Sequence, residues 1–309
     1  MKSRDPLRPV FVIGNPRSGT SLLRLMLTCH PDLVVPPECG FILWLHPKHG
    51  EWTGQQSGDP VAVAHFVDDL LACRKFDTWN LESNTLNAAI TRDLPADYAS
   101  LCACVVYTYA AAQGRSPRFW GDKNNFHIAH IGDLHRIYPS ARFLHITRDG
   151  RDVACSYRSV MSQGSESRYA PRLNTSAEDI AREWTSNIEA AESALATLPS
   201  EQRLTMSYEA LTSEPGPTLQ RICSWLGIPF DTRMLDFHEV NRTRQLEPAS
   251  TMDWKARTTS PVSSDTVGQF RRVLGADDIR AFESVAGPTL QKLGYPLHDA
   301  DAAEGHRTP

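Results

Sequence analysis

The chain has 309 residues and a formal net charge of −4, which gives no general basic field for binding nucleic acid. No segment approaches the ~18 to 20 consecutive apolar residues of a membrane span, and the first residues, MKSRDPLRP, contain no apolar signal core. The seven cysteines show no zinc-site spacing. We therefore expect a cytoplasmic protein with buried free thiols, without a metal, a nucleic-acid partner or a membrane span.

The segment 9–28, PVFVIGNPRSGTSLLRLMLT, is the first to predict a function. Val10 to Ile13 is an apolar, β-branched run that is typical of a buried parallel strand. The residues from Gly14 to Gly19 interrupt this run, and apolar residues then recur at helical spacing from Thr20 onward. A strand, a glycine-containing turn and a helix direct free backbone N–H groups toward an anion.

The turn differs at one position from the loop of nucleoside triphosphatases. Gly14 and Gly19 are spaced as in the pattern GxxxxGK[ST], but Thr20, followed by Ser21, stands where that pattern has its lysine. The cation of the loop is Arg17, three residues earlier. The sequence therefore predicts a phosphate-binding loop that lacks the nucleoside triphosphatase lysine. The alternative is an ordinary strand-to-helix turn with an unrelated arginine.

Further strands and helices alternate along the chain. Strands are predicted at 33–35, 119–123, 142–147 and 203–207, and helices at 61–75, 95–113, 128–138, 152–161, 177–198, 217–226 and 277–293. Residues 41–60 favour an irregular region that lines the surface, and residues 241–268 are polar with few periodic positions. Residues 162–176 are rich in Ser, Gly and Arg, which is typical of a mobile loop or lid.

This alternation predicts an α/β fold, a three-layer sandwich with a mostly parallel central sheet. In such folds ligands bind at the carboxyl ends of the strands. No interdomain linker or internal repeat is visible, so we expect a single domain over residues 1–309. Its core is expected at about 9–295, with a frayed tail at 297–309.

A second group of cations lies in RFLHITRDGRDVACSYR, where a predicted strand is followed by a helix. Arg148 and Arg151 lie in the turn, and Ser156 follows about two helical turns after Arg148. Guanidinium groups bind phosphate oxygens bidentately, so this pattern favours a second phosphate site. The alternative is a salt-bridged turn that pairs Arg148 with Asp152 and Arg151 with Asp149. Two phosphate sites together indicate a nucleotide phosphorylated at two ends.

The motifs GNPRSGTS and RDGRDVACS, each following a strand, resemble those of the sulfotransferases that use 3′-phosphoadenosine 5′-phosphosulfate as sulfuryl donor. The resemblance is strongest to the branch with arginine in the first loop, which includes tyrosylprotein sulfotransferases and many bacterial members. It runs from about Pro9 to Tyr295 and implies a P-loop nucleotide-binding fold. A P-loop kinase or nucleoside triphosphatase is the alternative function, and a non-catalytic nucleotide-binding scaffold is a third.

The resemblance implies which residues hold the donor. Its 5′-phosphosulfate would be bound by the first loop, namely by Arg17, Ser18, Gly19, Thr20 and Ser21. Arg148 and Ser156 would hold the 3′-phosphate, and Tyr208, in LTMSYEALTSEP, would lie near the nucleotide. Arg271 and Arg272, in VGQFRRVL, resemble more loosely a late basic segment that closes over the cofactor; either could instead be a solvated helix end.

Sulfuryl transfer needs in-line geometry, cations at the leaving phosphate and a base for the acceptor hydroxyl. Arg17 and Lys123 are the candidate cations; Lys123, in FWGDKNNFH, resembles the lysine of the family, although it could simply pair with Asp122. The resemblance implies Glu38, after HPDLVVPP, as the base, against the alternative of an exposed loop glutamate. His127 is the rival base.

The expected acceptor is a hydroxyl of a glycan, a lipid or a small molecule. Aromatic platforms suit sugars, phenols and lipids alike. Five rings lie in segments that could line an acceptor pocket, and some of them are expected in the core: Phe41, Trp44, Trp52, Trp79 and Trp120. His46 and His49 are expected to line that pocket or to face solvent, and His135 and His145 to be structural.

Overall fold

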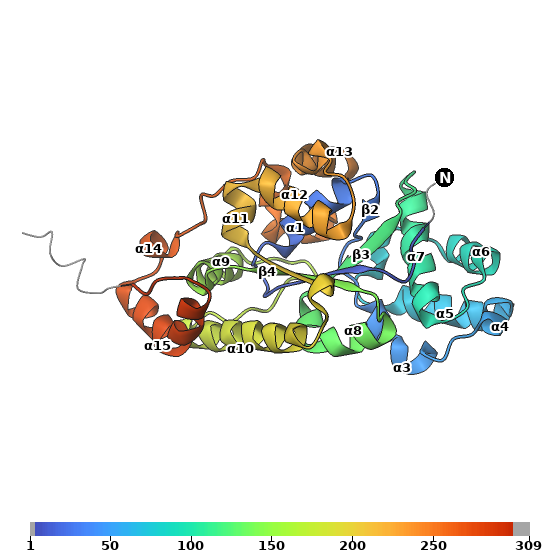
Figure 1. Ribbon diagram of the computed structural model, residues 1–309, viewed down its shortest axis with the longest axis horizontal. Helices are drawn as coiled ribbons and strands as arrows, with labels where there is room; N and C mark the ends of the chain where they lie inside the picture. The colour runs from blue at the N-terminus through green and yellow to red at the C-terminus, as the bar shows by residue number, and fades with distance from the viewer. Residues whose placement is uncertain (1–3, 299–309) are drawn as a thin grey trace, which may run out of the picture.

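The computed structural model describes residues 4–298 and arranges their strands as a parallel sheet in the order β2-β3-β1-β4-β5 (Figure 1). Every neighbouring pair of strands is parallel. The strands are β1 (Val10–Ile13), β2 (Leu33–Val34), β3 (Phe119–Lys123), β4 (Arg142–Thr147) and β5 (Arg203–Ser207). The α/β fold expected from the sequence is confirmed.

Helices cover both faces of the sheet because alternate strand residues point to opposite sides. Phe11 and Ile13 of β1 belong to one buried cluster, and Val10 and Val12 belong to another. In Figure 1, one face is covered by α1 (Thr20–Cys29), α11 (Tyr208–Ser213), α12 (Pro215–Leu226) and α13 (Phe237–Arg244). The other is covered by α8 (Ile131–Ile137) and α10 (Ala177–Ala196), and α15 (Ala276–Lys292) packs on α10.

The remaining helices extend these layers. Beside β3 lie α5 (Pro60–Ala72), α6 (Ser83–Asp93) and α7 (Tyr98–Ala112), and α9 (Gly150–Gln163) follows β4. Short elements complete the chain: η1 (Phe76–Trp79), η2 (Asn125–His130), η3 (Ser200–Gln202), η4 (Thr232–Met234), η5 (Ala249–Trp254), η6 (Ala256–Thr259) and α14 (Phe270–Val273). None of the helices in the described residues is long and apolar enough to cross a membrane.

The expectation of an irregular surface region at 41–60 is wrong. The segment forms α2 (Phe41–Trp44), α3 (His46–His49) and α4 (Gly54–Ser57), and Phe41, Ile42, Leu45 and Trp52 are buried. Each helix has four residues, too short for a hydrophobic period to be visible in the sequence.

Two longer helices were not predicted, and two sequence expectations remain open. The helices α6 and α13 are polar over most of their length, and each buries only a few side chains, so neither shows a strong period. Residues 164–176 contain no helix or strand, and their mobility stays a prediction. The tail expected to fray lies outside the described residues from position 299 onward.

Candidate active site

The first loop joins β1 to α1 through two residues in the left-handed region. Arg17 has φ 68° and Gly19 has φ 92°, and the Ser18 N–H donates to the carbonyl of Asn15 at 3.1 Å. No side chain caps α1, whose N-cap is Gly19. The N–H groups of the first helical turn therefore remain available to an anion, as the glycine-containing pattern predicted.

Tyr208 lies directly against this loop. A Cβ atom at Gly19 would be 2.4 Å from Cδ2 of Tyr208, so only glycine lets the loop approach the ring this closely. The Tyr208 hydroxyl is hydrogen-bonded to Oγ1 of Thr266 at 3.0 Å, and the guanidinium of Arg148 lies 4.2 Å from the ring centroid. Tyr208 therefore connects the first loop to the second cation group.

Replacing Gly19 by alanine is expected to weaken both folding and anion binding. A left-handed alanine costs about 1 to 2 kcal/mol, and its Cβ must also displace Tyr208. We expect a lower midpoint in urea and a loss of affinity for adenosine 3′,5′-bisphosphate. Gly216→Ala is the matched control, because no atom of the described residues lies within 4 Å of a Cβ there. Equal behaviour of the two variants would contradict the close approach.

The two cation groups meet in space although they are far apart in sequence. Nε of Arg17 donates to Oγ of Ser156 at 3.0 Å, across a separation of 139 residues. Nη1 of Arg148 donates to the carbonyl of Arg17 at 2.9 Å, and Nη2 donates to the carbonyl of Thr266 at 3.1 Å. The arrangement places both motifs at one site.

Among the described residues, no carboxylate forms an ion pair with either Arg17 or Arg148. Burial, followed by the charge of Arg148, lowers the pKa of Arg17 to about 10, and the charge of Glu38 offsets part of this effect. Two adjacent guanidinium groups without a counter-ion favour the binding of an anion.

The alternative of a salt-bridged turn is correct for one arginine only. Arg151 pairs with Asp149 at 2.7 Å and with Glu283 at 2.5 Å, so its positive charge is neutralised by carboxylates. Asp152 does not hydrogen-bond to Arg148; its carboxylate accepts the backbone N–H groups of Gly268 and Phe270. Arg148 is therefore available for a phosphate.

Two buried polar atoms support the same conclusion. Oγ of Ser18 and Nε of Arg148 are inaccessible to solvent and have no hydrogen-bond partner among residues 4–298. A buried donor without a partner is costly, so native structures seldom leave one. A bound phosphate would supply acceptors to both, and the residues present therefore fit a doubly phosphorylated nucleotide.

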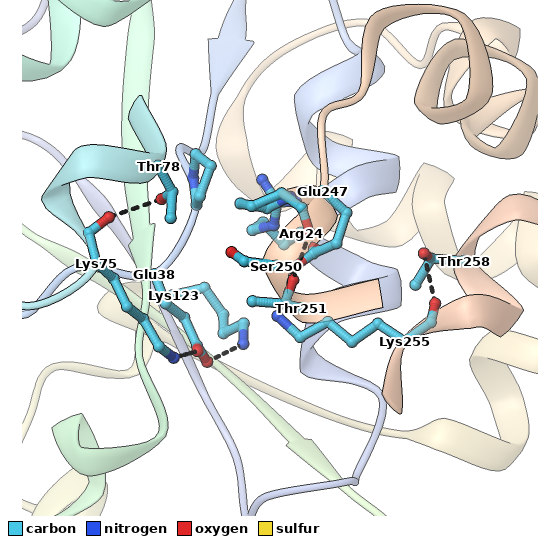
Figure 2. A network of polar contacts seen from close by, with 12 residues as sticks. Arg24, Glu38, Lys75, Thr78, Lys123, Glu247, Ser250, Thr251, Lys255 and Thr258 are labelled. Carbon is cyan, nitrogen blue, oxygen red and sulfur yellow. Dashed lines mark hydrogen bonds and ion pairs between the residues drawn. The ribbon is translucent and has the colours of Figure 1, made fainter. Parts of the chain in front are cut away.

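Glu38 lies at the centre of a charged cluster beyond the loop (Figure 2). Nζ of Lys123, at the end of β3, contacts Oε1 of Glu38, and Nζ of Lys75 donates to Oε2 at 2.6 Å. Burial alone would raise the pKa of Glu38, but Lys123, Lys255 and Lys75 together hold it well below its usual value. Burial lowers the pKa of Lys123 to about 8. Glu38 is therefore ionised and is not an exposed loop glutamate.

His127, the rival base, lies in the core. Its side chain has 0% exposure, and its ring packs edge-on against Phe11 with centroids 5.7 Å apart. Burial lowers the pKa of His127 to about 3 and raises that of the neighbouring Asp122 to about 8. Both ring nitrogens of His127 are buried, which argues against this residue as the base.

A second buried network, which the sequence analysis missed, faces Glu38 and Lys123 (Figure 2). Glu247 pairs with Nη2 of Arg24 at 2.6 Å and contacts Nζ of Lys255. The charge of Lys255 acts on Glu38 and Lys123. Arg24 could have been found from the sequence, because it is a charged residue within the apolar face of α1. No local pattern indicated Glu247 or Lys255.

This network predicts a loss of stability in acid. Burial alone would raise the pKa of Glu247, but Lys255 and Arg24 lower it to about 2. Its stabilising contribution is therefore complete above the ordinary carboxyl pKa of 4.5 and is lost as the pH falls toward about 2. Glu247→Gln should lower the free energy of unfolding by about 3 kcal/mol at pH 7. Between pH 4.5 and about 2, the free energy of unfolding should depend less on pH in this variant than in the wild type.

Urea unfolding at a series of pH values measures the pH dependence of the free energy of unfolding. Glu51→Gln is the control, because Glu51 is exposed. A Glu247→Gln variant that keeps the wild-type acid dependence would contradict this origin of the pH effect.

The remaining predicted residues have the following positions. Oγ1 of Thr20 is 3.3 Å from Oδ1 of Asn125, and Ser21 is half-buried on the first turn of α1. Arg271 and Arg272 are exposed on α14, where Arg271 lies over the Phe270 ring and Nη2 of Arg272 donates to the carbonyl of Asp265. A role for these two arginines in closing over a nucleotide stays a prediction.

Four of the five aromatic rings suggested for the acceptor pocket belong to the core. Phe41, Trp52, Trp79 and Trp120 are at most 3% exposed. Trp44 is 44% exposed and stacks on Phe126 at 5.7 Å. The imidazole of His49 is also buried, against Asp69 at 2.7 Å.

A parallel sheet, a glycine-containing loop with uncapped N–H groups at the start of α1 and convergent arginines are the features of a P-loop-type nucleotide-binding fold. In the part of the chain that the structure describes, no group of three or more His, Cys, Asp or Glu could hold a metal ion. The sulfotransferase family matches residues 9–232. The chain therefore belongs to the sulfotransferase family and is a transferase.

Individual relatives agree with this assignment. The chain is 24% identical to protein-tyrosine sulfotransferase 2 of Gallus gallus, over 97% of this chain and 72% of that one. It is 25% identical to nodulation protein NoeE of Sinorhizobium fredii, over 92% of this chain and 65% of that protein.

Two solved structures share the fold. The sulfotransferase domains of the curacin biosynthetic pathway and of the Synechococcus PCC 7002 olefin synthase both superimpose with a TM-score of 0.59. Their identities to this chain are 17% and 20%, and each match covers 96% of this chain. The coverage of those domains is 100% and 98%.

Proposed function

We propose that the protein transfers a sulfuryl group from 3′-phosphoadenosine 5′-phosphosulfate to an acceptor hydroxyl. The observation that carries the proposal is the contact of Arg17 with Ser156 and Arg148, which unites two anion-binding motifs. Glu38 lies near enough for its charge to act on Arg17. One site thus contains cations for a doubly phosphorylated donor and an ionised carboxylate for the acceptor.

The bound donor would supply a sulfuryl group whose leaving group is a phosphate oxygen. Glu38 takes the proton of the acceptor hydroxyl as the acceptor oxygen bonds to sulfur. The bond between sulfur and the phosphate oxygen breaks in line, and Arg17 and Lys123 stabilise the negative charge that develops on that oxygen. Ser18 and the first N–H groups of α1 hold the 5′ end, and Arg148 with Ser156 holds the 3′-phosphate.

For the acceptor we propose a hydroxyl of a glycan, a lipid or a small molecule, or the phenol of a protein tyrosine. The names of several relatives support the tyrosine, since they are protein-tyrosine sulfotransferases. The exposed Trp44, stacked on Phe126, is a surface that suits an aromatic or sugar ring.

Calorimetric titration tests the donor class. We expect micromolar binding of adenosine 3′,5′-bisphosphate and weak binding of ATP with magnesium, because Thr20 replaces the lysine of the nucleoside triphosphatase loop. A preference for magnesium ATP would overturn the proposal in favour of a P-loop kinase. Transfer is then followed as release of the bisphosphate from the donor in the presence of a phenol, a tyrosine peptide or an oligosaccharide.

A further inference from the structure

Lys75 contacts the carboxylate of Glu38, the proposed base, and it lies in neither of the two phosphate motifs. Its Nζ is 2.6 Å from Oε2 of Glu38, while Lys123 contacts Oε1 (Figure 2). The side chains of Lys75 and Glu38 are only 18% and 11% exposed. Both oxygens of the proposed base are therefore bound by lysines, one from β3 and one from the start of η1.

The backbone of Lys75 is unusual for a lysine. Its φ of 71° lies in the left-handed region, which costs a side chain roughly 1 to 2 kcal/mol relative to glycine. The conformation is fixed by Oγ1 of Thr78, which donates to the Lys75 carbonyl at 2.7 Å. Glycine or asparagine would adopt this turn more readily, and neither could reach Glu38 with a cation. The strain favours a functional reason for lysine at this position.

Lys75 and Glu38 are also held in fixed relation to each other. Nε1 of Trp79, which is buried, donates to the carbonyl of Pro37 at 3.0 Å, one residue before Glu38. On the outer side Asp77 pairs with Arg168 at 2.5 Å and accepts the hydroxyl of Tyr169. The segment that carries Lys75 is therefore anchored both to the Glu38 segment and to the loop at 164–176.

We propose that Lys75 is a positioning residue of the transfer reaction, which orients Glu38 toward the acceptor hydroxyl. The inference rests on the proposed function. Lys123 must interact with two anions, Glu38 and the leaving phosphate, whereas within residues 4–298 the side chain of Lys75 pairs with no carboxylate other than Glu38. When Lys123 turns to the phosphate, Lys75 keeps Oε2 fixed, and Oε1 becomes available to accept the hydroxyl proton.

Other charged groups also face Glu38 and contribute to the pH dependence of its titration. Asp122 shares β3 with Lys123, and His127 lies in η2. Lys255 follows η5, and Arg17 lies in the first loop. These groups remain in a variant of Lys75, so a change between variant and wild type reports the Lys75 charge.

Three variants of the full chain test the proposal. Lys75→Met removes the charge at similar length, Lys75→Arg keeps it, and Lys48→Met is the control, because Lys48 is 64% exposed and pairs with Asp69. The first readout is the carboxyl ¹³C titration of Glu38 by NMR with adenosine 3′,5′-bisphosphate bound, assigned by its absence in Glu38→Gln. The second is the pH profile of sulfuryl transfer from the donor to water, which needs no identified acceptor.

We expect Lys75→Met to raise the titration midpoint of Glu38, since a neighbouring cation stabilises the carboxylate. The acid limb of the rate should move to higher pH, and the maximal rate should fall about tenfold. Affinity for the bisphosphate should stay unchanged in all variants. Lys75→Arg should restore both the midpoint and the limb, and Lys48→Met should match the wild type.

Two results would overturn the positioning role of Lys75 and leave the proposed function intact, and a third would refute both. A Glu38 midpoint and limb that do not move in Lys75→Met show that Lys75 does not act on the base. A Lys75→Arg variant as impaired as Lys75→Met shows that shape, and not charge, matters. A wild-type protein that binds no bisphosphate refutes the proposed function itself and removes the positioning role with it; the Glu38 titration in that protein separates this case from the other two.

Discussion

Replacement of Arg17 by alanine should lower the affinity for adenosine 3′,5′-bisphosphate by about 100-fold and turnover by at least as much. The variant loses charge-assisted hydrogen bonds to a phosphate, worth about 1.5 to 3 kcal/mol, and a cation at the leaving oxygen. It also loses the contact with Oγ of Ser156 that links the two phosphate motifs. Calorimetry and release of the bisphosphate from the donor measure the two effects.

Without ligand, the Arg17→Ala substitution should not lower the stability of the folded protein. Burial and the charge of Arg148 lower the pKa of Arg17 to about 10, so the folded protein holds this cation at a cost. Since the pKa is lowered on folding, the cost applies at every pH below about 10. Alanine removes it, and the melting temperature without ligand should not fall.

Arg280→Ala is the control for Arg17→Ala, because Arg280 is an exposed arginine that pairs with Asp277 on α15. It should change neither affinity nor melting temperature. If Arg17→Ala melts well below the wild type in the absence of ligand, then Arg17 has a structural role and its binding defect cannot be attributed to the phosphate.

The site residues that could be predicted are those with a local signal. The change from a β-branched strand to a glycine-containing turn and an apolar helix lies within twenty residues, so β1, the loop and α1 were visible in the sequence. The bounds of β3, β4 and β5 were likewise predicted: β4 contains apolar and β-branched residues, β3 begins with two aromatic residues and ends in a polar cluster, and β5 is a short segment between two helices.

The residues that escaped prediction depend on contacts between distant parts of the chain. Arg24 and Glu247 are 223 residues apart, and Glu38 and Lys75 are separated by a helical segment. No local pattern distinguishes a lysine that will lie on a buried carboxylate from one that will be solvated. His127 shows the converse case: its proximity to Lys123 in sequence suggested a base, whereas packing against Phe11 buries the ring.

The substitution Glu38→Gln should lower turnover by about 100-fold or more and leave the bisphosphate affinity within a few-fold of the wild type. Glutamine has nearly the same shape and can still accept a hydrogen bond from Lys123, but it cannot take the proton of the acceptor hydroxyl. Because Glu38 titrates well below its usual pKa, the wild-type acid limb should lie below the ordinary carboxyl range in the free enzyme. Glu239→Gln, an exposed glutamate beside Arg242, is the control.

The comparison with His127 decides which residue is the base. His127→Phe keeps a ring of similar size in the apolar site against Phe11 and removes both nitrogens. If Glu38 is the base, this variant should fold and turn over within a few-fold of the wild type. If His127→Phe loses turnover while Glu38→Gln retains it, the base is the histidine, and the core around η2 must open during the reaction. In the part of the chain that the structure describes, the buried nitrogens of His127 have no hydrogen-bond partner, so their loss costs the fold little.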